Sequence, residues 1–120
     1  MKDLFEFNFD FLNIPIKIKV LTYSNKIDVV EYFDLEIWGG DAGFFVRKGE
    51  ASIVFSETNY DKISDYSHEI LHAVKHQLAK LGIDDEEIEC YMLGYLLQIY
   101  TDFLEIHKKK IEELENDTIE

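Results

Sequence analysis

The sequence predicts an α+β domain in which a mainly antiparallel N-terminal sheet is followed by two or three helices packed on one face. Apolar residues alternate with polar ones in the first half, which is typical of strands with one buried face. In the second half they recur at helical spacing. Because strands precede helices without βαβ alternation, we expect one domain over residues 1–120. Its parts are a strand-rich half (1–58), a helical part (59–104) and a charged helix or tail (105–120).

The first two strands are expected to form a hairpin. Apolar residues occupy odd positions in the first run and even positions in the second: Phe5, Phe7, Phe9 and Phe11, then Ile14, Ile16, Ile18 and Val20. A turn or bulge at Leu12 and Asn13 would keep both runs facing one core. Pro15 indicates an edge position near the start of the second strand.

Further strands are expected at 29–33 and 36–38, and then at 44–47 and 51–55 after a glycine-rich turn. The glycines between 39 and 43 mark a tight turn, or a place where another group approaches the backbone closely.

A helix is expected from about Asp61, with Asn59 or Ser64 as its cap and Gly82 as its end. Its apolar residues follow helical spacing: Ile63, Tyr66, Ile70, Val74, Leu78 and Leu81. A second helix is expected to open at Asp84 and Asp85, whose carboxylates suit the positive end of a helix. It continues into the charged segment 105–120, which is either a third helix or a fraying extension.

The composition excludes several classes of function. The formal charge is −13, so binding to nucleic acid is not expected, because phosphate contacts need clustered Lys and Arg. The single cysteine, Cys90, excludes an internal disulfide and a zinc site built from several thiolates. The charged N-terminus does not resemble a signal peptide, and no uncharged stretch near the C-terminus is long enough to span a bilayer. We therefore expect a cytoplasmic protein without a membrane partner.

The segment from His68 to His72 reads HEILH, an HExxH pattern within the first predicted helix. Residues four apart lie on one face of a helix, so the two imidazoles can converge on one cation. This spacing suits Zn²⁺, with His68 and His72 as ligands. Glu69 can then act as general base toward a water molecule that the metal activates.

A third ligand is expected, because a catalytic zinc usually takes three protein ligands and leaves one position for water. Lys75 and Leu78 occupy the positions where the metzincin pattern requires glycine and histidine. Carboxylates remain as candidates, and an antiparallel second helix would bring Glu86, Glu87 or Glu89 back toward the metal. We favour Glu87, and the other two stay open.

Other polar residues near this pattern have weaker claims to a role. Tyr91 and Tyr95, one and two turns after Glu87, are candidates to donate a hydrogen bond to a developing oxyanion, although buried packing explains tyrosines equally well. His76 continues the stripe of the two histidines. It is either an alternative ligand or a proton donor, or else a histidine that contacts the ligands without binding the metal or is partly exposed, and these last two are favoured. His107 lies beside three lysines and is expected on the surface.

Residues 64–100 resemble small zincin-like proteins encoded by phages and prophages, which are themselves similar to gluzincin metallopeptidases. The resemblance is carried by HEILHAV (68–74), LGI (81–83), EIECY (87–91) and LGYL (93–96), with Cys90 where an alanine is usual. It implies that His68, His72 and Glu87 are the metal ligands and that Glu69 is catalytic. It also implies a host-cell location and a peptide or protein as substrate or target.

Three functions follow from these observations. The first is a minimal zinc metallopeptidase or hydrolase. The second is a non-catalytic zincin-like protein that binds a host or defence protein through its acidic surface. The third is a metal-free α+β domain in which HExxH arises by chance.

Overall fold

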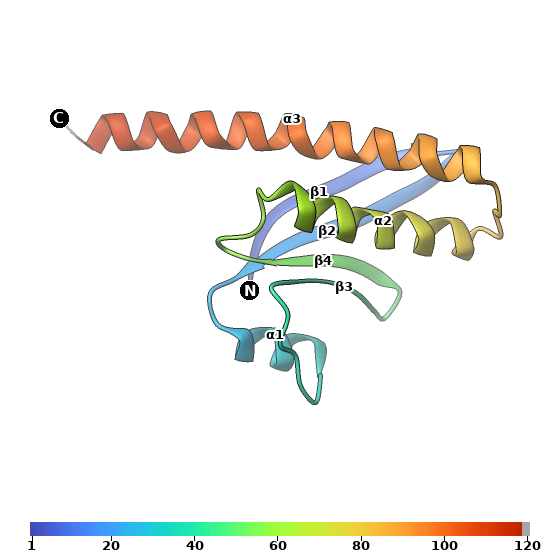
Figure 1. The fold of residues 1–120 in the computed structure, drawn as a ribbon, viewed down its shortest axis with the longest axis horizontal. Coiled ribbons are helices and arrows are strands. Elements are labelled where there is room, and N and C mark those ends of the chain that lie inside the picture. The colour runs from blue at the N-terminus through green and yellow to red at the C-terminus, as the bar shows by residue number, and fades with distance from the viewer. Residues whose placement is uncertain (119–120) are drawn as a thin grey trace.

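The computed structural model describes residues 1–118, which form an α+β fold, as predicted. Its elements are β1 (Lys2–Phe11), β2 (Ile14–Tyr23), α1 (Lys26–Phe33), β3 (Ala42–Arg47), β4 (Glu50–Ser56), α2 (Ile63–Lys80) and α3 (Glu86–Thr118). In Figure 1, α2 and α3 lie on one side of the sheet and α1 lies on the other side. The two helices that follow the sheet therefore share one face.

The sheet has the strand order β1-β2-β4-β3. The outer pairs, β1 with β2 and β3 with β4, are antiparallel, while β2 and β4 are parallel. The sheet is therefore mainly antiparallel, as predicted. Strand β3 is one edge, and it is the strand most closely associated with α2.

The predicted hairpin between the first two strands is confirmed. Leu12 and Asn13 form its turn and both have positive φ, at 52° and 64°, which is the conformation of tight hairpin turns. Strand β2 lies inside the sheet, but β4 pairs with it only from Ile18 onward. Pro15, opposite Asp10 of β1, therefore lies where β2 has a single neighbour.

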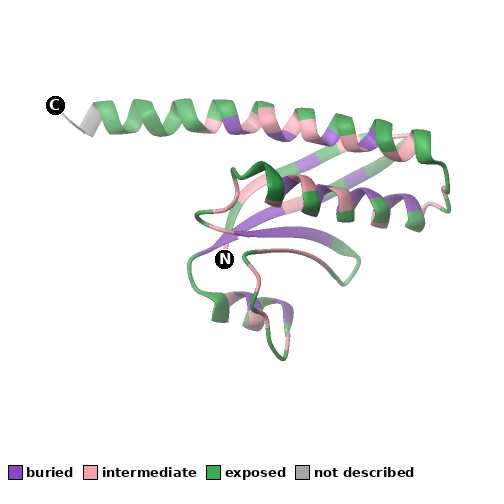
Figure 2. Cartoon of the chain, in the orientation of Figure 1, coloured by how far each residue is buried: buried purple, intermediate pink, exposed green. Residues whose placement is uncertain are grey.

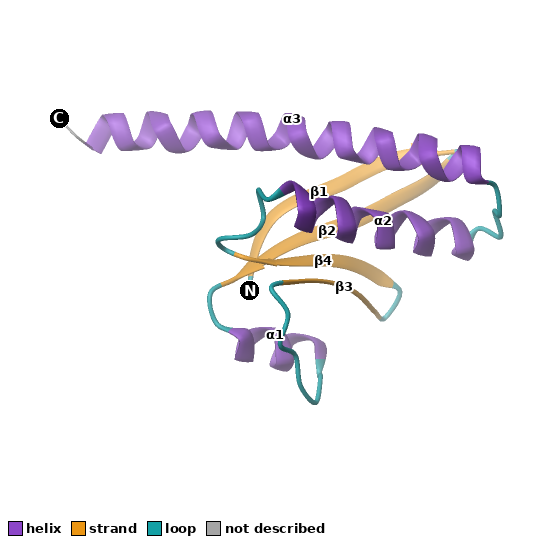
Figure 3. Cartoon of the chain, viewed as in Figure 1, coloured by secondary structure: helices purple, strands orange, loops and turns teal. Residues whose placement is uncertain are grey.

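The strand predicted at 29–33 is wrong, because this segment belongs to α1 (Figure 3). The Asn25 side chain caps the helix by accepting a hydrogen bond from the Ile27 amide at 3.1 Å. The helix buries Val29 and Phe33, which lie four residues apart on one helical face. These side chains cover the outer face of the sheet beside Val54.

The strand predicted at 36–38 is also wrong. Helix α1 ends at Asp34, whose φ of 54° is left-handed, and the chain then runs as a loop to Ala42. Ile37 is 86% exposed, so this apolar residue is not part of a packed strand. The strands predicted at 44–47 and 51–55 are confirmed within β3 and β4.

The main core lies between the sheet and the helices α2 and α3 (Figure 2). Its largest fully buried side chains include Phe7 and Phe55 from the sheet, Ile70 from α2, and Leu96 and Tyr100 from α3. The inward residues alternate along the strands and recur at helical spacing on the helices. This is the pattern from which the fold class was predicted.

The predicted caps of α2 are wrong, although its predicted end is confirmed. The N-cap is Lys62, which makes no capping hydrogen bond through its side chain, and Asn59 instead donates to Asp65 at 2.8 Å. At the other end Gly82 has φ of 71°. The Ile83 amide donates to the Leu78 carbonyl at 2.9 Å, which completes a Schellman turn.

Helix α3 opens where the sequence indicated, since the Asp85 side chain accepts from the Ile88 amide at 3.1 Å. The segment predicted as a third helix or an extension, 105–120, continues α3 to Thr118, and residues 119–120 lie outside the described part. Among the described helices, none is both long and apolar enough to cross a membrane.

Candidate metal centre

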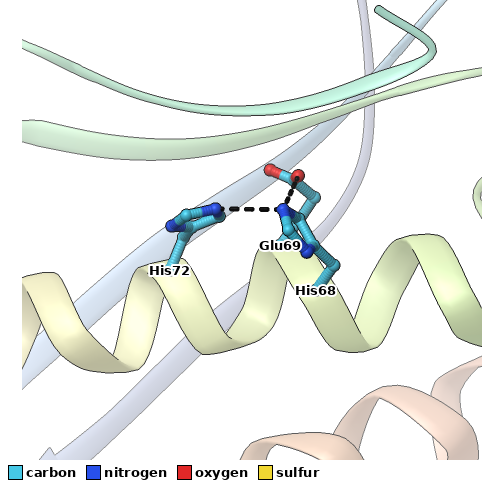
Figure 4. A group of neighbouring side chains, drawn as sticks. All are labelled: His68, Glu69 and His72. Carbon is cyan, nitrogen blue, oxygen red and sulfur yellow. Dashed lines mark hydrogen bonds and ion pairs between the residues drawn. The ribbon is translucent and has the colours of Figure 1, made fainter.

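His68, Glu69 and His72 bring their polar atoms together on α2, within 4.8 Å of one another. The two Nε2 atoms of the histidines lie 3.1 Å apart. Nε2 of His68 lies 3.7 Å from Oε1 of Glu69. Figure 4 shows that all three side chains rise from the same side of the helix.

The helix itself produces this convergence. Each residue advances the direction of the side chain by about 100°, so His72 lies about 40° from His68 around the axis. Glu69 lies about 100° from His68, at the border between the exposed face and the core. The histidines are therefore exposed, whereas Glu69 is only 5% exposed.

The spacing of the two imidazoles fits a tetrahedral metal ion. Zinc binds imidazole nitrogen at about 2.0–2.1 Å, which places two tetrahedral nitrogen ligands about 3.3 Å apart. The observed separation is 3.1 Å. Among the described residues, His68, Glu69 and His72 are the three potential metal ligands whose polar atoms lie close enough together to share one ion.

Glu69 is a buried carboxylate whose Oε2 atom has no hydrogen-bond partner among the described residues. Burial raises the pKa of Glu69 above its ordinary value, and the nearby His68 and His72 lower it in part. An unpaired buried acceptor costs about 1–3 kcal/mol. A cation, or a water molecule held by one, would supply the missing partner.

A hollow of about 380 Å³ opens beside this group, between α2 and the start of β3. Its wall consists of Asp41, Ala42, Ser64, Asp65, His68 and Glu69. Asp41 and Asp65 were not among the residues that the sequence singled out. The sequence could have indicated Asp65, because it lies three residues before His68 and so on the same helical face. Asp41 comes from a distant loop, so no local pattern indicates it.

The structure does not bring Glu87 to the histidines. Glu87 is exposed on the first turn of α3, and it does not belong to the candidate metal group. The first turn of α3 lies beside the second half of α2, where Glu89 forms a 2.8 Å ion pair with Lys75. Glu86 lines another hollow, at the turn between the two helices.

The tyrosines on α3 also lie away from the group. Tyr91 is 75% exposed. The ring of Tyr95 packs edge-on against Phe9 of β1, with centroids 5.4 Å apart. Neither phenol contacts His68 or His72, so their predicted role as oxyanion donors has no support in this arrangement.

The remaining histidines have separate neighbours. His76 is half-buried and packs against Phe44 of β3 at 5.5 Å between ring centroids. His107 was predicted on the surface, but it is half-buried, because its ring stacks on that of Phe103 with 5.3 Å between the ring centroids. Neither residue belongs to the candidate metal group.

No protein-family model matches the chain, and neither a curated protein nor a solved structure is significantly similar to it. The candidate site is therefore judged by its own geometry and chemistry.

Proposed function

We propose that this chain is a minimal zinc metallopeptidase that hydrolyses amide bonds in peptides. One observation carries the proposal. Two imidazole nitrogens lie 3.1 Å apart beside a buried carboxylate that has an unpartnered oxygen. Such a carboxylate is not expected on an ordinary helix, because buried polar groups are normally hydrogen-bonded.

The donor atoms favour zinc over magnesium or calcium, because imidazole nitrogen suits transition metals and the hard cations prefer oxygen. His68 and His72 would hold the ion. When bound, zinc supplies a Lewis acid that lowers the pKa of water to about 7 and polarises a carbonyl group.

Glu69 would handle the proton. Its carboxylate lies next to the imidazoles, at 3.7 Å from Nε2 of His68, so it can accept a proton from the attacking water. It can then deliver that proton to the leaving amine. Because Glu69 is buried, packing restricts its side chain, although Oε2 has no hydrogen-bond partner among the described residues.

An extended peptide has a surface to pair with beside these residues. Strand β3 is an edge of the sheet, and Ala42 at its start lines the same hollow as Glu69. A peptide added along this edge would gain backbone hydrogen bonds from β3. Its carbonyl groups would then pass close to the histidines.

The test compares zinc content and peptide hydrolysis in matched variants. We expect one zinc per wild-type chain by metal analysis, and loss of that zinc in His72→Ala. Glu69→Gln should keep the zinc but lower the hydrolysis of a mixed peptide library, followed by mass spectrometry, by about 100-fold or more. Undiminished hydrolysis by Glu69→Gln would exclude the mechanism.

Glu87→Gln is the matched control, since it makes the same chemical change on α3. We expect it to keep both zinc and hydrolysis, because Glu87 lies outside the metal group. Loss of zinc in this variant would instead support the ligand set that the sequence predicted.

The second candidate is a non-catalytic protein that binds a host or defence protein through its acidic surface. Two observations favour it: the net charge of −13, and a metal group that, among the described residues, draws no ligand from α3. Under this function Glu69→Gln would leave binding to the target intact, and wild-type protein would hydrolyse no peptide.

A further inference from the structure

The hollow beside the histidines is lined by acidic groups. Asp41, Asp65 and Glu69 all contribute to its wall, and no lysine or arginine does. These residues come from two separate segments, the loop before β3 and the first half of α2. The fold thus brings carboxylates together at the side of the metal group.

The carboxylates that line the hollow can carry more negative charge than one divalent metal ion neutralises. When all three carboxylates are ionised they carry three negative charges, and a divalent ion held by the two histidines beside Glu69 would neutralise two of them. One negative charge is then left without a counter-charge. A monovalent cation from outside the chain would balance it.

A second metal ion does not fit this arrangement. Within the described residues, His68, Glu69 and His72 are the group of three metal-binding side chains whose ligand atoms lie within 4.8 Å of one another. Neither Asp41 nor Asp65 therefore lies close enough to two other potential ligands to form a second such group. A hollow of about 380 Å³ is also far larger than a bare ion needs.

Glu69, whose unpartnered oxygen also supports the metal ion, indicates that the hollow receives a ligand. The side chain is 6% exposed, lines the hollow and leaves Oε2 without a partner. Asp65 is already oriented, since the side-chain amide of Asn59 donates a hydrogen bond to Oδ2 of Asp65 at 2.8 Å. The wall of the hollow is therefore partly preorganised to accept hydrogen bonds from a donor.

We propose that this hollow binds a positively charged organic group of the peptide substrate, through Asp41 and Asp65. The group is either the N-terminal ammonium of a peptide or the charged side chain of a lysine or arginine. This inference rests on the proposed function and names its substrate class. The overall charge of −13 would also attract such substrates over a longer range.

The experiment measures binding of three small probes by NMR, from shifts of the Ala42 and Asp65 amide signals. Alaninamide carries only an α-ammonium group, and Nα-acetyl-lysinamide carries only a side-chain ammonium group. Nα-acetyl-norleucinamide is the uncharged counterpart of the second probe. Each is titrated into the zinc-loaded and the metal-free chain, so that the measurement does not depend on turnover.

We expect at least one ammonium probe to bind more tightly than the norleucine probe. Asp41→Asn and Asp65→Asn should each weaken that binding roughly 2- to 5-fold, as expected for ion pairs open to solvent. Asp10→Asn is the control, because Asp10 is exposed on β1 and the variant changes the net charge equally. It should leave binding unchanged.

The pattern of binding also identifies the source of the cation. Binding of alaninamide alone assigns the hollow to a peptide N-terminus, and binding of the lysine probe alone assigns it to a side chain. Equal binding of the norleucine probe, or unchanged binding in both aspartate variants, would overturn the proposal. A second zinc per chain that is lost in Asp65→Asn would overturn it in favour of a second metal ion.

Failure of the proposed function gives a different result. In that case the wild-type chain lacks zinc, or Glu69→Gln hydrolyses peptides as fast as wild type does. The probes still report on the hollow, because they are also titrated into the metal-free chain.

Discussion

Helices α2 and α3 pack side by side on the sheet, yet they are buried to very different extents. Along the 18 residues of α2, buried positions recur from Tyr66 to Leu78. Helix α3 has 33 residues, but Leu104 is its last buried position among those described. Figure 2 shows the far half of α3 as largely exposed, beyond the edge of the sheet.

This difference explains where the candidate metal group lies. The sheet fixes α2 through its buried face, so the neighbouring side chains have a defined direction. Glu69 and the histidines therefore meet, even though the histidines themselves are exposed. Glu87 is on the first turn of α3, which lies beside the other end of α2, so it does not reach this group. A sequence pattern becomes a site only where packing holds the backbone and the side chains.

The largest expected effect compares the same substitution in the two helices. Ile70→Ala should lower the free energy of unfolding by about 2–5 kcal/mol, because Ile70 is 1% exposed and its removal leaves a cavity. Ile106→Ala should change it by less than about 0.5 kcal/mol, because Ile106 is 57% exposed. Urea denaturation of both variants gives the two values. Similar losses would contradict the contrast between the helices.

A smaller effect concerns Glu69 in the metal-free chain. Burial raises its folded-state pKa above the ordinary value of 4.5, so the folded chain binds this proton more tightly than the unfolded chain. The resulting stability is present below about pH 4.5 and is lost as the pH rises through the folded-state pKa. As the pH rises through this range, the free energy of unfolding of wild type should therefore fall relative to that of Glu69→Gln.

Thermal unfolding of both proteins across this pH range, with chelator present, gives the measurement. Added zinc should remove the loss on the high-pH side in wild type, because the metal stabilises the ionised carboxylate. A pH-independent difference between the two proteins would show that Glu69 does not titrate differently in the folded state.

The smallest effect concerns the ion pair that joins the two helices. Nζ of Lys75 lies 2.8 Å from Oε1 of Glu89, and this hydrogen bond and charge raise the pKa of Lys75. Reversing either charge should lower Tm slightly, and reversing both should restore it. Because the pair is near solvent, 1 M salt should reduce the effect. Failure of the double variant to recover would mean that the two side chains do not interact.

Much of the fold was predictable because alternation and helical spacing reflect burial directly. The run from Phe5 to Val20 specified a hairpin, and the spacing from Ile63 to Gly82 specified α2. Helix α1 was missed because Val29, Val30 and the aromatic residues after them favour strands. The cap at Asn25 and burial against the outer face of the sheet outweighed that local preference.

The convergence of His68, Glu69 and His72 was predictable because it depends on spacing within one helix. The position of Glu87 was not, because it depends on how α3 is staggered against α2. Glu89 meets Lys75, and seven residues of helix, about 10 Å, separate Lys75 from His68. No local pattern in the sequence encodes that stagger, and the same holds for Asp41, which reaches the hollow from another segment.

The projecting half of α3 also affects how the protein moves through solution. The radius of gyration of the Cα atoms is 15.6 Å, compared with about 13.6 Å for a compact domain of this length. A monomer of this shape has more hydrodynamic drag than a sphere of the same mass. Gel filtration would therefore overstate its size, and light scattering is the appropriate way to count its subunits.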